Sequence, residues 1–177
     1  MNYTGMIYRP PMEANSVLLQ VTTGCSHNKC AFCYMYHDIP FSVSPMEEVM
    51  ADIDEAARIW AGAERVFLEN GDAFCLSAER LKRIADAIHE KHPKVNTIAM
   101  YASIQNIRGK TDKELRMLHE CGINDLNIGV ESGLDVALER LNKGHTADEA
   151  IYELKRLNDA GIECSCTVRK QATENKR

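Results

Sequence analysis

The strongest constraint on the fold is a repeated order in which a capped helix is followed within a few residues by an apolar strand. Apolar residues at helical spacing occur in four segments, which begin after the N-cap candidates Ser44, Ser77, Thr111 and Thr146. Three of these helices are predicted to end at Gly62, Gly122 and Gly161, and the remaining one ends before Pro93. Apolar strands are predicted at 16–22, 65–69, 95–101, 124–130 and 162–168.

Alternation of this kind is typical of right-handed βαβ crossovers, which build parallel sheets. With about five βα units, the chain is predicted to be an α/β protein with a partial TIM-like (β/α) barrel. Ligands of such sheets bind at the carboxyl ends of the strands. We therefore expect the chemistry of this chain in the segments that directly follow its strands.

Length and charge narrow the class of protein. The 177 residues fit one domain, and the formal charge of −5 argues against a large phosphate-binding face, so no nucleic-acid partner is expected. No signal peptide is visible and no apolar run approaches about 18 residues, so no membrane association is expected. Seven cysteines without a secretory signal indicate a reduced, cytoplasmic chain with thiolate ligands.

Three of these cysteines, Cys25, Cys30 and Cys33, fall in one short loop directly after the first predicted strand. Cys-x4-Cys-x2-Cys spacing on a strand-to-helix connection is typical of a metal–thiolate site. Three thiolates can hold three irons of a [4Fe–4S] cluster and leave the fourth iron without a protein ligand. An open iron can bind a substrate or a cofactor, so the loop is interpreted as a reaction centre.

The loop resembles the radical S-adenosylmethionine (SAM) superfamily, whose commonest pattern is Cys-x3-Cys-x-aromatic-Cys. Phe32 fills the aromatic position, and one extra residue separates Cys25 from Cys30. The flanking residues 22–24 and 34–36 look most like the branch with oxygen-independent coproporphyrinogen oxidase and the elongator-type enzymes. The resemblance implies a [4Fe–4S] cluster, SAM bound at the open iron, and a 5′-deoxyadenosyl radical that takes hydrogen from an unknown substrate. It also implies a low-potential electron donor such as flavodoxin or ferredoxin.

Segments after the later strands resemble the SAM contacts of that superfamily. Asn70-Gly71-Asp72 resembles the segment that meets the SAM amino group, Glu131 lies in another contact segment, and Lys143 matches a cation for the SAM carboxylate. Ser103 is expected to touch the nucleoside and Phe32 the adenine. Each has a plainer alternative, namely an Asn-Gly turn, a surface Glu or Lys, or packing of Phe32 against the barrel. No catalytic side chain is assignable beyond the cluster.

His37 opens a different interpretation of the loop. The spacing of Cys25, Cys30, Cys33 and His37 also permits a tetrahedral Cys3His zinc site in a module that supports protein or RNA contact. The surrounding strand–helix frame favours the cluster. A further alternative is an inactive remnant that holds a cluster poorly, because polar residues follow Val168 where this superfamily usually continues with an apolar, Gly-rich turn.

The chain is divided at residue 168. Residues 1–168 are predicted to form a truncated radical SAM core, and 169–177 a polar, mobile tail. Cys164 and Cys166 share one face of the last strand and are expected to pack as small buried residues, like Cys75 and Cys121, with a second metal site or a redox pair as the alternative. The substrate is not specified, because the same core serves methylthiolation, decarboxylation and tRNA modification.

Overall fold

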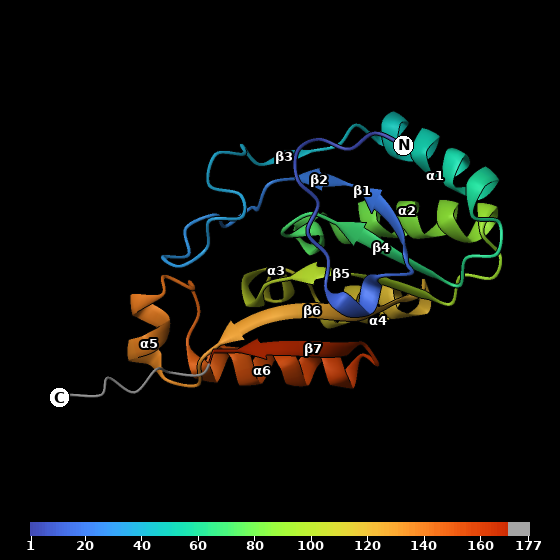
Figure 1. Ribbon diagram of the computed structural model, residues 1–177. Coiled ribbons are helices and arrows are strands. Elements are labelled where there is room, and N and C mark those ends of the chain that lie inside the picture. The colour runs from blue at the N-terminus through green and yellow to red at the C-terminus, as the bar shows by residue number, and fades with distance from the viewer. Residues whose placement is uncertain (170–177) are drawn as a thin grey trace.

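The computed structural model describes residues 1–169, which fold around a five-stranded parallel sheet (Figure 1). The strands are β1 (Val17–Gln20), β4 (Arg65–Glu69), β5 (Thr97–Ala102), β6 (Ile123–Glu131) and β7 (Glu163–Val168). They lie in the order β1-β4-β5-β6-β7, which is also their order along the chain. Each new strand is therefore added beside the previous one after a crossover, as expected for part of a TIM-like barrel. The predicted α/β architecture is confirmed.

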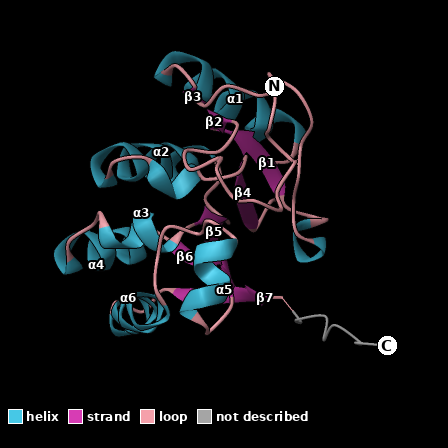
Figure 2. Ribbon diagram, turned by 90° about the vertical axis from the view of Figure 1, so that its left-hand side faces the viewer, coloured by secondary structure: helices cyan, strands magenta, loops and turns pink. Residues whose placement is uncertain are grey.

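Four long helices cover one face of this sheet, as Figure 2 shows. They are α1 (Met46–Ile59), α2 (Ala78–Lys91), α4 (Asp112–Glu120) and α6 (Ala147–Asp159). Two short helices were not anticipated, α3 (Ile104–Arg108) after β5 and α5 (Asp135–Arg140) after β6. The remaining elements are the 3-10 turns η1 (Pro11–Glu13) and η2 (Ala73–Cys75), and an antiparallel pair of β2 (Thr22–Thr23) and β3 (Ser42–Val43).

The hydrophobic core lies between these helices and the sheet. Ile98 and Met100 of β5 are completely buried, as are Leu81 and Ile84 of α2. Burying an aliphatic side chain of this size contributes about 1.5–3 kcal/mol. The core is therefore sufficient to fix the sheet, and with it the positions of the loops that follow the strands.

Three of the four predicted helix caps are confirmed. The Ser77 side chain accepts a hydrogen bond from Arg80 N, and Thr111 and Thr146 each form a complete capping box. The prediction for Ser44 is wrong, because Pro45 occupies the N-cap position of α1 and no side chain caps that helix. The acidic Glu47 in the first turn of α1 is compatible with the positive end of the helix dipole.

Within residues 1–169, the opposite face of the sheet carries no helical layer. The N-terminal segment, residues 1–13, crosses in front of it (Figure 1). Thr4 N donates to Gln20 Oε1 over 2.8 Å, and at the far end the buried Glu13 accepts a 2.9 Å hydrogen bond from Arg65 Nε. Arg65 also pairs with Asp125 of β6. The Arg65 ion pairs thus close the amino-terminal end of this face.

β7 forms one edge of the sheet, and all six of its residues are exposed. The expectation that Cys164 and Cys166 are buried is therefore wrong. Both are free and exposed, because no described element packs on the strand's outer side. Of the predicted polar tail, residues 170–177 lie outside the described residues.

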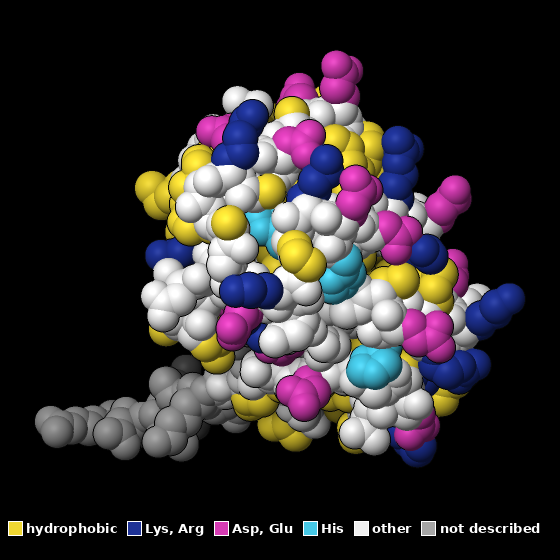
Figure 3. All heavy atoms as spheres, turned by 90° about the vertical axis from the view of Figure 1, so that its right-hand side faces the viewer, with side chains coloured by type: hydrophobic (Ala, Val, Ile, Leu, Met, Phe, Trp, Pro, Cys, Tyr) yellow, Lys and Arg dark blue, Asp and Glu magenta, His cyan; other side chains and the backbone are white. Residues whose placement is uncertain are grey.

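Charged side chains are mixed over the end of the molecule that faces the viewer in Figure 3, where the strands begin. Basic and acidic residues alternate there without a patch of one sign. That end therefore offers no continuous basic surface for a phosphate backbone. Within residues 1–169, no helix is long and apolar enough to cross a membrane.

Candidate functional site

The cysteine loop, residues 25–33, lies where the sheet's strands end. Gly24 precedes it with a φ of +67°, and a Cβ there would come within 2.9 Å of the Ile39 carbonyl oxygen. The loop is held from two sides: Gly71 N donates to Gly24 O over 3.1 Å, and Ala31 N donates to Leu141 O over 3.0 Å. The loop is thus tied both to the end of β4 and to the segment after α5.

The three thiols of this loop are half-buried neighbours. Burial raises the pKa of Cys25 and of Cys30, and Lys143 opposes the shift at Cys30. The charge of Cys30 raises the pKa of Cys25, and the charge of Cys33 raises that of Cys30. Among residues 1–169, however, no three His, Cys, Asp or Glu side chains converge in a metal-binding arrangement.

The donor set fits a cubane cluster better than a single ion. Three half-buried thiols within one loop match the number and type of protein ligands that an open-cornered [4Fe–4S] cluster requires. A tetrahedral zinc site needs a fourth protein ligand close by. The structure places the predicted fourth ligand, His37, with its side chain 71% exposed and its Nδ1 3.2 Å from Asp38.

The Asn70-Gly71-Asp72 segment lies directly against the cysteine loop. Asn70 has a φ of +77°, and its amide donates to Thr22 O over 3.0 Å. A Cβ on Gly71 would lie 3.0 Å from the Cβ of Cys25. The residue at position 71 therefore has to be small for the end of β4 to reach the loop.

Asp72 is buried and already satisfied by protein groups. Its carboxylate accepts hydrogen bonds from Ser26 Oγ and from Asn106 Nδ2. Burial raises the pKa of Asp72, and these two hydrogen bonds oppose the rise. Asp72 thus connects the cysteine loop to α3.

Glu131 and Lys143 lie close together over Gly129. A Cβ on Gly129 would come within 2.8 Å of Glu131 Oε1 and 3.4 Å of Lys143 Nζ. Lys143 Nζ also lies 5.9 Å from the centre of the Phe32 ring. Glu131 has a φ of +71°, a conformation that costs a non-glycine residue energy. The structure therefore brings together three of the predicted SAM contacts.

A cavity of about 310 Å³ opens beside this group, between Glu131 and α5. Arg169 lines it, 3.8 Å from the centre of the Phe32 ring. Arg169 Nε forms an ion pair with Glu131 Oε2 at 3.3 Å. The cavity gives Glu131 an open side.

Ser103 has a structural role at the end of β5. Its side chain accepts a 3.3 Å hydrogen bond from Asn106 N and caps α3. The same helix turn positions Asn106 toward Asp72. Ser103 therefore supports the site through α3.

Residues that the sequence interpretation missed complete the loop. The Asn28 amide donates to Tyr36 O over 2.9 Å, and the buried Tyr36 hydroxyl has no partner in the part of the chain that the structure describes. His27 Nε2 lies 2.7 Å from Asn142 O. The sequence signal for Tyr36 was an aromatic residue three positions after the last cysteine. Nothing in the sequence indicated that it would be buried or that Asn28 would contact it.

Comparison with known proteins agrees with this geometry. The sequence profile described as "Radical SAM superfamily" matches residues 19–169, and the chain belongs to that superfamily of enzymes. The cofactors of the superfamily are a [4Fe–4S] cluster and SAM. The predicted resemblance is thus confirmed.

Two curated relatives illustrate the relationship. The chain is 24% identical over 164 residues to 4′-phospho-dehydrooxetanocin synthase of Priestia megaterium, which covers 83% of this chain and 22% of that protein. It is 26% identical over 98 residues to the heme chaperone HemW of Bacillus subtilis (strain 168). This alignment covers 55% of this chain and 26% of the relative. The chain therefore spans about a quarter of the length of these relatives.

Solved structures share the fold. The cobalamin-dependent SAM radical enzyme OxsB, with aqua-cobalamin and SAM bound, matches with a TM-score of 0.73 at 19% identity, over 86% of this chain and 23% of that one. Methylornithine synthase (PylB) matches with a TM-score of 0.60 at 19% identity, over 85% and 43%. Coproporphyrinogen III oxidase (HemN) from Escherichia coli matches with 0.56 at 13% identity, over 86% and 36%.

Proposed function

We propose that this chain binds a [4Fe–4S] cluster through Cys25, Cys30 and Cys33 and cleaves SAM reductively, to start hydrogen abstraction from a substrate. The observation that carries the proposal is the cysteine loop itself. Its three half-buried thiols lie in one loop at the carboxyl ends of a parallel sheet, in a chain of the radical SAM superfamily.

The proposed roles of the surrounding residues follow from their positions. The turn at Asn70 and Gly71 brings polar backbone beside the loop and is assigned to the SAM amino group. Lys143 supplies a point charge for the SAM carboxylate. Glu131 accepts from the ribose hydroxyls, and Phe32 packs near the adenine. The cluster, when bound, supplies the electron that cleaves the SAM sulfonium.

The substrate is not transferred from the relatives. The names of the relatives include a synthase of a phosphorylated oxetanocin precursor, a heme chaperone and a methylornithine synthase, which are different chemistries. We propose only that a low-potential protein such as flavodoxin or ferredoxin supplies the electron. The same fold does not choose among substrates.

Anaerobic reconstitution with ferrous salt and sulfide tests the proposal. We expect about four iron and four sulfide per chain, and 5′-deoxyadenosine when SAM and a strong reductant are added. Serine variants of Cys25, Cys30 and Cys33 should each lose the cluster. Cys121→Ser is the matched control, since Cys121 is also half-buried but lies after α4. One zinc per chain without sulfide would overturn the proposal, and a stable cluster without SAM cleavage would leave an inactive remnant.

A further inference from the structure

Glu69, the last residue of β4, is a buried acid without a partner. Its side chain is 0% exposed, and neither carboxylate oxygen has a hydrogen bond among the described residues. Burying an unpaired polar group of this kind costs free energy, so such groups are rare and need an explanation. Nothing in the packing of the core requires a carboxylate here.

The carboxylate faces the side of the sheet that carries no helices. Arg65, Phe67 and Glu69 alternate along β4 with the core residues Val66 and Leu68, so they share the opposite face. Phe67 packs edge-on against Tyr101 of β5, with 5.3 Å between ring centres. The position of Glu69 is therefore the interior of the partial barrel.

Two tyrosines, Tyr36 and Tyr3, are near enough to feel the charge of Glu69. Burial and nearby charges, that of Glu69 among them, raise the pKa of Tyr36 and that of Tyr3. The Tyr36 hydroxyl is also buried without a partner, and its ring packs edge-on against Tyr8 at 5.5 Å. A carboxylate beside tyrosine rings is a suitable environment for an organic cation, which ring faces and an anion both attract.

No described cation satisfies Glu69. Arg65 is engaged with Glu13 and Asp125, and Lys110 donates to Phe74 O on the helical side. Burial alone accounts for the raised pKa of Glu69, without a compensating positive charge. The charge of an ionised Glu69 is therefore uncompensated among the described residues, and one incoming cation would neutralise it.

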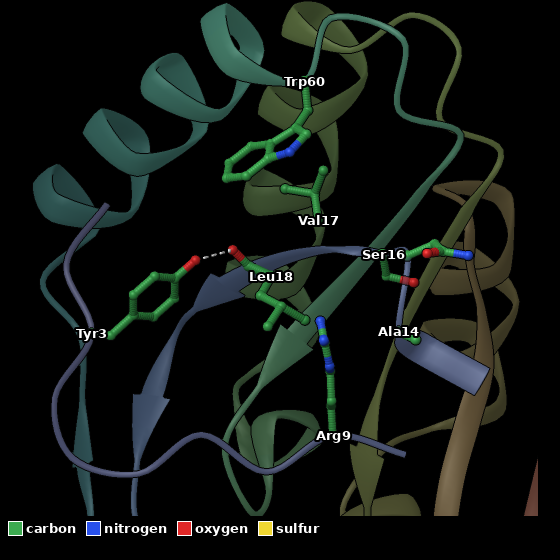
Figure 4. Close-up of a pocket in the computed structure, with 8 residues that line it drawn as sticks. Tyr3, Arg9, Ala14, Ser16, Val17, Leu18 and Trp60 are labelled. Atoms are coloured by element: carbon green, nitrogen blue, oxygen red, sulfur yellow. Dashed lines mark hydrogen bonds between the residues drawn. The ribbon is translucent and has the colours of Figure 1, made fainter. Parts of the chain in front are cut away.

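The N-terminal segment covers this region and is anchored at both ends, by Met1 and Asn2 at Asp52 and by Glu13 at Arg65. Thr4 bonds to Gln20, which pairs in register with Glu69, and the Tyr3 hydroxyl donates to Leu18 O over 3.1 Å. A cavity of about 370 Å³ lies beside the segment (Figure 4), and Tyr3, Leu18 and Trp60 line it but Glu69 does not. Arg9 extends into this cavity beside Leu18 but does not bond to Glu69.

We propose that Glu69 is a recognition residue that binds an alkylammonium group in the interior of the sheet. This proposal rests on the proposed function, because it makes that group either part of the substrate or the α-ammonium of SAM. We infer that the ammonium group belongs to the substrate, since Asn70 and Gly71 are assigned to SAM and the Glu69 side chain faces the interior.

Three small probes of one shape test this proposal on the full chain. Benzylamine, benzyl alcohol and benzoate differ in charge, and their affinities can be measured by ligand-observed NMR or calorimetry on anaerobically reconstituted protein. We expect benzylamine to bind best and Glu69→Gln to weaken it about tenfold to hundredfold, the usual range for a charge-assisted hydrogen bond. Glu163→Gln, which changes an exposed acid at the start of β7, is the matched control and should leave all affinities unchanged.

The outcomes separate the alternatives. If benzylamine still binds with SAM at saturation, the amine is carried by the substrate, and if SAM displaces it, Glu69 binds the SAM ammonium. Equal binding of the three probes, or no effect of Glu69→Gln, would overturn the proposal. Arg9→Gln should leave the benzylamine affinity unchanged, and a large gain there would instead identify Arg9 as the partner of Glu69. The cluster absorption reports separately on the proposed function, which can fail while the amine site holds.

Discussion

The backbone N–H of Gly71 donates a 3.1 Å hydrogen bond to the carbonyl oxygen of Gly24, the residue before Cys25. This contact joins the end of β4 to the start of the cysteine loop. Neither residue has room for a Cβ, because one on Gly24 would meet the Ile39 carbonyl and one on Gly71 would meet the Tyr36 ring and Cys25.

Gly71→Ala should therefore disturb the site. The new Cβ would overlap the Tyr36 ring and lie 3.0 Å from the Cβ of Cys25, and overpacking of this kind costs about 1–3 kcal/mol. We expect a lower melting temperature and less iron and sulfide after reconstitution. Gly62→Ala is the control, since a Cβ there has no neighbour within 4 Å. Equal cluster content in the two variants would contradict the assigned role of the contact.

The stability of the cluster-free protein should fall as the pH rises from about 4.5 to 7. Burial raises the pKa of Glu69 from 4.5 to about 7, so the folded state keeps a proton that the unfolded state has lost. The loss of stability across this window is on the order of 3 kcal/mol. Urea unfolding at several pH values measures it.

Glu69→Gln should remove this pH dependence and be more stable than the parent protein above about pH 7. Glu163→Gln should follow the parent at every pH, because Glu163 is exposed. A parent protein whose stability rises across the window relative to Glu69→Gln would show that the carboxylate has a cationic partner in the free protein.

Asp72→Asn should loosen the cysteine loop. The buried carboxylate accepts from Ser26 and Asn106, and hydrogen bonds to a charged group contribute about 1.5–3 kcal/mol. We expect a loss of about 2 kcal/mol in unfolding free energy and faster loss of iron to a chelator. Asp38→Asn lies in an exposed part of the same region and should change stability by less than about 0.5 kcal/mol.

His37→Ala distinguishes the cluster from a zinc site. The His37 side chain is mostly exposed and its nearest charged partner is Asp38, so its removal should leave iron and sulfide content unchanged. A Cys3His zinc site would instead lose much of its metal affinity with one ligand removed. Metal analysis of the variant after reconstitution with either metal decides between them.

The repeated helix–strand pattern was sufficient to predict the parallel sheet and most of its boundaries, because apolar periodicity and caps such as Thr111 and Thr146 are local signals. α3 and α5 were missed since five or six residues carry too little periodicity. The burial of Cys164 and Cys166 was predicted wrongly. That two residues share one face of a strand follows from the local backbone geometry, whereas their burial depends on what packs against that face.

The candidate site was predicted in part. The cysteine spacing and the places of Glu131 and Lys143 followed from sequence, but the contact of Asp72 with Ser26 and Asn106 did not. That contact joins three segments that are distant in the chain, and only the folded sheet brings them together. The sequence also did not show that Glu69 lacks a hydrogen-bond partner among the described residues, because that depends on every residue that packs around it.

The N-terminal segment that crosses the open face has a consequence for how such a chain diversifies. The proposed cluster ligands lie in residues 25–33, whereas the interior face is bordered by the leading residues of the chain. Mutations in those leading residues can alter selectivity without touching the layer of helices. New specificities can therefore evolve at the front of the sequence while the thiolate loop is inherited intact.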